Sequence, residues 1–309
     1  MPIPSIIAVA IGDPANSRLI TDMSQLNGVR PYITGLVFYL SEQDYTIGTD
    51  YTIDYRECYE GTEDFTGADT AGTNNIIFCM STPVVRKAVA FTSQVPIVGV
   101  FSDYKGEKFN QTNNVCGVTA NRIDNAKDYY DKFVDAASNL PAIYILHRPK
   151  NTASEQSLAN HKKAHPTVKL PELDVTTAAG NDPRQDIQNA INSATNNSGL
   201  LVLPVDLFFG AADTINSTAK SKSMPVFWPL SDWVPPGLVG YGVSQYDSGQ
   251  SMGQQVQYIL DNPKNIPPDP YRFTSAGTPR WVASQAAAKV LSFANNKLAL
   301  QQQNGLLII

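Results

Sequence analysis

The sequence has few charged residues and no long apolar run. Charged residues make up 17% of the 309 residues, and 23 Lys and Arg against 28 Asp and Glu give a formal net charge of −5. Nucleic-acid binding needs a basic face, and this sequence has no run of Lys and Arg, so a nucleic-acid partner is not expected. The apolar stretches at 5–12 and 33–40 are far shorter than the roughly 20 residues of a membrane span. We therefore expect no direct membrane span.

The motifs by which α/β enzymes are usually recognised are also missing. The sequence contains no GxxxxGK[ST] loop, GxSxG elbow, GxGxxG fingerprint or CxxC pair. Cys58, Cys79 and Cys116 are an odd number without metal-ligand spacing, and we expect buried structural thiols. The N-terminus shows no signal peptide, so either the protein is cytoplasmic or a leader has been removed.

One histidine pair has a spacing that can hold a metal. His161 and His165 lie four residues apart in HKKAH, but Lys162 stands where the metalloprotease motif has Glu. We interpret the pair as part of a solvated helix face, with a metal contact as the less favoured alternative.

Short apolar runs alternate with helical spacing along the whole chain, which predicts parallel sheets with crossover helices. The length exceeds what one core usually supports, so two α/β lobes are expected, with a boundary near 115–122. Predicted strands are 5–11, 51–55, 75–80, 96–101, 115–118, 142–146, 168–175, 199–204, 224–228 and 238–243. Predicted helices are 31–44, 63–71, 83–92, 123–138, 154–164, 183–194, 211–220, 247–260 and 283–298.

Four aspartates each follow a predicted strand: Asp13, Asp103, Asp206 and Asp232. In an open parallel sheet the ligand lies outside the carboxyl ends of the strands. Each Asp alone has an equal alternative, which is to cap the next helix. Four together favour a binding site.

Seven stretches, in order, resemble one known family. They are GTDYTIDYRE (48–57), MSTPVVRKAV (80–89), VPIVGVFSDY (95–104), NNVCGVTANR (113–122), LPAIYILHRPKNTASEQS (140–157), MPVFWPLSDW (224–233) and GLVGYGVSQYDSGQSMGQQVQYIL (237–260). The family is the ABC-transporter solute-binding proteins of the type I periplasmic-binding-protein fold, in the group that contains tryptophan and other aromatic amino-acid binders.

The resemblance implies a Venus flytrap of two Rossmann-like, three-layer αβα lobes joined by three crossovers. The N-terminal lobe would comprise 1–116 and 246–272, and the C-terminal lobe 117–245 and 273–309, with the ligand cleft between them. The crossovers near 115–122, 243–247 and 270–277 would absorb the rotation of closure.

In the first lobe, the resemblance implies that Ser81 and Thr82 open a helix whose N-terminus receives a ligand carboxylate. Asp103 matches the family's aspartate after the fourth strand. The family usually has Asp-Pro there, whereas this chain has Asp103 followed by Tyr104, and its connection at 13–31 is longer.

In the second lobe, Asn151 and Ser154 match the ligand-facing loop, and Asp206 and Asp232 match acidic positions that would pair an α-amino group. Tyr104 and Trp233 either stack on a planar ligand or pack in the core or at its rim.

The resemblance thus implies a non-catalytic, extracytoplasmic solute-binding component of an ABC importer. Its partners would be a small polar or aromatic metabolite, such as an amino acid, and a permease, with no cofactor and no metal. The location would be periplasmic, or extracellular and lipid-anchored, although the missing signal peptide leaves a cytoplasmic location open. The alternatives are a ligand-sensing regulatory protein of the same fold and an α/β enzyme without a recognisable motif.

Overall fold

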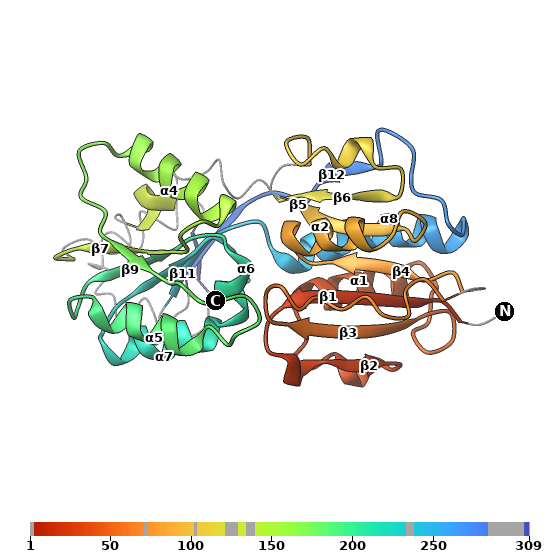
Figure 1. Cartoon of the computed structure of the whole chain (residues 1–309), viewed down its shortest axis with the longest axis horizontal. Coiled ribbons are helices and arrows are strands. Elements are labelled where there is room, and N and C mark those ends of the chain that lie inside the picture. Colours follow the sequence, from red (N-terminus) through yellow and green to blue (C-terminus); the bar gives the residue numbers. More distant parts are fainter. Residues whose placement is uncertain are drawn as a thin grey trace. The chain divides into compact units, whose positions relative to one another are not determined.

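The computed structural model divides the chain into two compact units (Figure 1). It describes residues 3–70, 73–101, 104–120, 129–133, 140–232, 238–283 and 306–308. Unit 1 is Met1–Asn121 with Gln245–Gly277, and unit 2 is Arg122–Ser244 with Thr278–Ile309. The predicted boundary at 116/117 falls inside the strand Val115–Thr119, and the predicted boundary at 272/273 falls just before the strand Phe273–Ser275. These two strands pair within unit 1.

Unit 1 is built on a seven-stranded sheet of order β12-β6-β5-β4-β1-β3-β2. Its strands are β1 (Ser5–Ile11), β2 (Arg18–Ile20), β3 (Thr52–Cys58), β4 (Ile76–Cys79), β5 (Ile97–Phe101), β6 (Val115–Thr119) and β12 (Phe273–Ser275). All pairings are parallel except that of β2 with β3. Strands β4 and β5 are buried throughout, as expected for a parallel sheet covered on both faces.

Helices cover this sheet because alternate strand residues point to opposite faces. Ile7, Val9 and Ile11 of β1 pack with Val84 and Ala88 of α2 (Thr82–Phe91) in one apolar cluster. Helix α1 (Pro31–Glu42) packs along α8 (Gln245–Asp261), which also contacts β5 and β6. The shorter 3-10 helices are η1 (Pro14–Asn16), η2 (Met23–Leu26) and η3 (Phe109–Gln111).

Unit 2 has a second seven-stranded sheet, of order β14-β13-β11-β10-β9-β7-β8. Its strands are β7 (Ile143–His147), β8 (Glu172–Asp174), β9 (Gly199–Val202), β10 (Val226–Trp228), β11 (Leu238–Gly242), β13 (Arg280–Ala283) and β14 (Leu306–Ile308). The pairing of β11 with β13 is antiparallel and the others are parallel.

The described helices of unit 2 follow its strands in the same alternation. They are α4 (Thr152–Ala164), α5 (Arg184–Ser193), α6 (Asp206–Gly210) and α7 (Ala212–Ser221). Residues 129–133, the described part of the helix predicted at 123–138, are also helical. The core of the unit joins Phe133, Ile215, Phe227 and Trp228. The two parallel-dominated sheets confirm the predicted α/β class.

One predicted helix is wrong. Residues 63–70 of the predicted helix 63–71 form no helix, because the Asp64 side chain accepts hydrogen bonds from the Thr66 backbone and hydroxyl, and Gly67 has a φ of +87°. Both features favour turns over helix. The helix predicted at 283–298 begins on the last residue of β13 and otherwise lies outside the described residues.

All three cysteines are free and buried in unit 1, which confirms the predicted structural thiols. Among the described residues, no helix is both long and apolar enough to cross a membrane.

Candidate functional site

The strand order of each sheet reverses at one point. In unit 1 the chain passes from β1 through the edge strand β2 to β3, which neighbours β1, and then crosses to β4 on the other side of β1. In unit 2 it passes from β7 to β8 and returns to β9 on the other side of β7. Ligands of open α/β sheets bind outside the carboxyl ends of the strands at such a reversal. The candidate positions are therefore the carboxyl ends of β1 and β4, and those of β7 and β9.

The predicted residues of unit 1 lie at this edge. Asp13 follows β1, Ser81 and Thr82 follow β4, and Tyr104 follows β5, and these three strands are neighbours in the sheet. Asp103 lies outside the described residues. The sheet thus brings four of the predicted residues to the carboxyl ends of its strands. Two of these strands, β1 and β4, flank the reversal.

Ser81 and Thr82 form the N-terminus of α2, as predicted. Ser81 is 4% exposed and is the N-cap residue, with its hydroxyl accepting from the Val84 backbone N–H at 3.5 Å. Thr82 is also buried. The first N–H groups of a helix lack intrahelical acceptors and lie at the positive end of its dipole, so this terminus suits an anionic group.

Asp13 caps the following helix, which was the alternative to its predicted role in ligand binding. Its carboxylate accepts from the Ala15 backbone N–H at 3.0 Å and caps η1. Its own backbone N–H donates to Glu57 Oε2 at 2.9 Å. The connection after β1 is therefore held in place by a side chain at the end of β3.

That side chain belongs to a buried network that the sequence did not reveal. Glu57 Oε1 accepts from Arg30 Nε at 3.1 Å and from the Tyr55 hydroxyl at 2.5 Å. The Arg30 and Glu57 side chains are 9% and 5% exposed, and Arg30 also donates to the Ile11 carbonyl at 2.9 Å. Burial, and then the Glu57 charge, raise the pKa of Tyr55. The network fixes the carboxyl ends of β1 and β3 beside the reversal.

Tyr104 packs on the protein itself. Its ring stacks on Phe273 with centroids 4.4 Å apart and planes 6° apart. Phe273 lies in β12, the edge strand beside β6. This arrangement is the core or rim packing that was the alternative to ligand stacking.

The predicted loop residues of unit 2 cap α4. Asn151 is the N-cap residue, and its side chain accepts from the Ser154 backbone N–H at 3.1 Å. Ser154 has no exposed surface, and its hydroxyl accepts from the Arg148 backbone N–H at 2.9 Å. Ser154 therefore organises the loop after β7 from inside the fold.

The two acidic positions follow neighbouring strands of unit 2. Asp206 is the first residue of α6, follows β9 after a short connection at 203–205, and is half-buried. Asp232 follows β10, and its carboxylate accepts from the Ser244 hydroxyl at 3.0 Å. Trp233 lies outside the described residues. Of these, Asp206 and Asn151 flank the reversal between β7 and β9.

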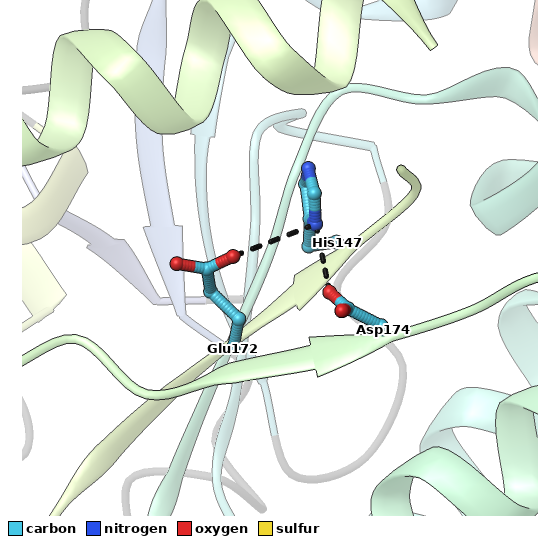
Figure 2. Close-up of side chains that lie close together, drawn as sticks. All are labelled: His147, Glu172 and Asp174. Atoms are coloured by element: carbon cyan, nitrogen blue, oxygen red, sulfur yellow. Dashed lines mark hydrogen bonds and ion pairs between the residues drawn. The ribbon is translucent and has the colours of Figure 1, made fainter. Parts of the chain in front are cut away.

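The histidines depart from their predicted environment. His161 has no exposed surface, so the solvated face predicted for HKKAH is wrong for this residue. Instead, the group of described residues able to hold a metal ion consists of His147, Glu172 and Asp174, whose ligand atoms all lie within 4.8 Å of one another (Figure 2).

The comparisons with known proteins place these features in context. The family model described as ABC transporter substrate binding protein matches residues 6–298. Among curated proteins, no sequence matches the chain significantly.

Solved structures share the fold over nearly the whole chain. A conserved domain protein from Vibrio cholerae has a TM-score of 0.70 at 17% identity, covering 96% of this chain and 98% of its own. An ABC domain from Streptococcus pneumonia in complex with L-Trp has a TM-score of 0.67 at 14% identity, covering 99% and 100%. A substrate binding protein with adhesive properties from Clostridium difficile, in a ligand-free, open structure, has a TM-score of 0.56 at 18% identity, covering 100% and 99%. These likenesses confirm the predicted type I periplasmic-binding-protein fold.

Proposed function

Because the chain belongs to the family of ABC transporter substrate binding proteins, we propose that it binds a small solute without turnover and delivers it to an ABC permease. We further propose that the solute carries both an anionic and a cationic group, as an amino acid does. The observation that carries this proposal is the chemistry at the two strand-order reversals.

In unit 1, the buried N-terminus of α2 beside the reversal offers Ser81, Thr82 and backbone N–H groups to an anion. In unit 2, Asp206 beside the other reversal offers a carboxylate to a cation. An α-carboxylate and an α-amino group would match these two sites. The L-Trp bound to the Streptococcus pneumonia structure supports the amino-acid class.

We also propose that one solute molecule uses residues of both units and so favours the closed form of the protein. A ligand shifts a conformational equilibrium only by its differential affinity for the two states. Contacts from both units would provide that difference.

The first test is thermal unfolding of the full chain with a panel of amino acids, aromatic metabolites, nucleosides and sugars. A ligand at about 100 times its Kd adds roughly 2.7 kcal/mol of stability, which raises Tm by several degrees. We expect an amino acid to give this shift. A shift with sugars or nucleosides alone would overturn the proposed class.

The second test compares site variants with matched controls. Thr82→Val and Asp206→Asn each remove one polar contact, and since a hydrogen bond to a charged group contributes about 1.5–3 kcal/mol, we expect affinity to fall more than tenfold. Thr218→Val changes an equally buried threonine inside α7, and Asp213→Asn changes an aspartate in the first turn of that helix. Neither control follows a strand, and both should bind as wild type.

The delivery role is tested separately, with the permease and its ATPase in proteoliposomes. Solute-loaded protein should stimulate ATP hydrolysis more than solute-free protein. Saturable binding without any stimulation would instead support a ligand-sensing regulatory role, and turnover of the bound solute would support an enzyme.

A further inference from the structure

A second polar cluster lies at the carboxyl ends of β7 and β8 in unit 2. His147 is the last residue of β7, and Asp174, the last of β8, is its direct partner in the parallel register. Glu172 lies two residues earlier in β8, and residues i and i+2 of a strand face the same side. The sheet register therefore places both carboxylates beside one imidazole.

The two carboxylates converge on the same ring nitrogen (Figure 2). His147 Nδ1 is 2.8 Å from Asp174 Oδ1 and 3.8 Å from Glu172 Oε2. The imidazole is 5% exposed, whereas the side chains of Asp174 and Glu172 are 55% and 32% exposed. The cluster is thus anchored on its histidine side and open to solvent on its carboxylate side.

The other ring nitrogen provides an independent observation. His147 Nε2 is buried and has no hydrogen-bond partner, and a third carboxylate, Glu155 Oε1, lies 3.6 Å from it. Nδ1 itself is hydrogen-bonded to Asp174 Oδ1 at 2.8 Å. A neutral imidazole has one N–H group, so with its proton on Nδ1 it has none to donate toward Glu155, and only the protonated ring donates from both nitrogens. A metal ion bound at Nδ1 would satisfy both sides of a neutral ring, because the ring proton would then reside on Nε2 and point toward Glu155.

We propose that His147, Asp174 and Glu172 bind a divalent transition-metal ion, with zinc as the best fit. One imidazole and two carboxylates, completed by water, match the ligands that zinc accepts, whereas magnesium and calcium prefer oxygen ligands alone. Glu155 is the outer carboxylate that orients the histidine, as is usual for metal-bound imidazoles. Glu172 Oε1 pairs with Lys162 Nζ at 2.5 Å, which leaves Oε2 to face the ion.

The ion would also stabilise the loop that follows β7. Glu155 Oε1 accepts from the Lys150 backbone N–H at 3.0 Å, and the loop ends at Asn151, the cap of α4. The ion would hold His147 at one end of this loop. His147 would in turn hold Glu155 through its Nε2. The test needs the metal alone, so its outcome is distinguishable from that of the solute tests.

The test is calorimetric titration of the chelator-treated full chain with ZnCl2, followed by Co²⁺ absorption as a readout of coordination. We expect one zinc per chain and a visible cobalt spectrum. Asp174→Asn and Glu172→Gln should weaken zinc binding at least tenfold, and Glu155→Gln by about tenfold, as outer-carboxylate changes usually do. None of these three side chains is buried, so the variants should fold, which circular dichroism checks.

Two controls separate this site from others. His165→Gln removes the more exposed histidine of HKKAH, and Asp182→Asn removes an exposed carboxylate paired with Arg184. Both should bind zinc as wild type. The proposal is overturned if the wild type binds no zinc, if Asp174→Asn and Glu172→Gln bind it unchanged, or if His165→Gln abolishes binding.

Discussion

His161 shows how burial sets the chemistry of a single residue. It lies on the inner side of α4 with no exposed surface, and neither ring nitrogen has a hydrogen-bond partner. Burial, and to a lesser degree the charge of His165, lower the pKa of His161 from its ordinary 6.5 to about 4. The folded protein therefore keeps this ring neutral under mildly acidic conditions.

This lowered pKa predicts a specific loss of stability in acid. Between pH 6.5 and about 4, the unfolded chain binds a proton at His161 that the folded chain does not, so the free energy of unfolding falls as pH falls through this window. At about 1.4 kcal/mol per pKa unit, the full loss is about 3 kcal/mol. Urea unfolding across the window should show this fall in the wild type, over and above that of His161→Leu, which cannot take up the proton.

His165→Gln is the matched control, since it removes the neighbouring histidine and should keep most of the fall. If the wild type and His161→Leu lose stability in parallel, then the pKa of His161 is not lowered in the folded protein.

Helix–helix contact in unit 1 depends on glycine. A Cβ on Gly249 of α8 would lie 2.1 Å from the Tyr32 carbonyl oxygen of α1, and one on Gly35 of α1 would lie 2.1 Å from the Tyr246 carbonyl oxygen. Both obstacles are backbone atoms, which cannot rotate away. These glycines let α8, from the second segment of unit 1, lie close against α1.

We therefore expect Gly249→Ala to destabilise the protein. Alanine favours a helix by about 1 kcal/mol over glycine, but overpacking against a fixed backbone typically costs about 1–3 kcal/mol. Chemical denaturation should show a lower midpoint for Gly249→Ala. Gln254→Ala, an exposed position of the same helix, should stay within about 0.5 kcal/mol of wild type. Wild-type or higher stability for Gly249→Ala would contradict the close packing.

The central strands of both sheets were predictable, whereas the edge strands of unit 1 were not, and the edge strand β8 of unit 2 is shorter than the strand predicted at 168–175. Strands β1, β4, β5 and β9 are continuous apolar runs, because a parallel sheet buries them on both faces. Strands β2 and β12 have three residues each, and short edge strands carry little periodic signal. Their existence depends on partners far away in sequence, as with β12 and β6.

The candidate site was predictable in position and less so in contacts. Asp13, Ser81 and Asp206 follow strands, which a pattern of apolar runs reveals. The sequence could not show that Asp13 caps η1 or that Tyr104 stacks on Phe273, because rotamers and long-range partners decide such contacts.

Two charged clusters escaped the sequence analysis for the same reason. The Arg30–Glu57 pair joins residues 27 positions apart, as does the His147–Asp174 pair. The available signals were a glutamate near the end of a buried strand and the acidic-apolar-acidic pattern of Glu172 to Asp174. Neither signal identifies its partner.

On the scale of the whole molecule, the two units carry different natural probes. Cys58, Cys79 and Cys116 all lie in unit 1, and Trp228, Trp233 and Trp281 all lie in unit 2. Burial raises the pKa of Cys58 to about 12 and that of Cys79 well above its usual value. Since the thiolate is the reactive form, thiol labelling reports the opening of unit 1, and tryptophan fluorescence reports unit 2.

These probes test whether one solute uses both units. For the amino acid selected by the thermal panel, we expect both the labelling and the fluorescence transitions to move to higher denaturant in the wild type. Thr82→Val in unit 1 should reduce the ligand-induced shift of the fluorescence transition, and Asp206→Asn in unit 2 should reduce that of the labelling transition, because each removes part of a shared binding energy. Thr218→Val and Asp213→Asn should keep both shifts. If Asp206→Asn abolishes the shifts while Thr82→Val leaves them at the wild-type size, Thr82 is not a ligand contact, and the assignment of an anion site to the N-terminus of α2 loses its support.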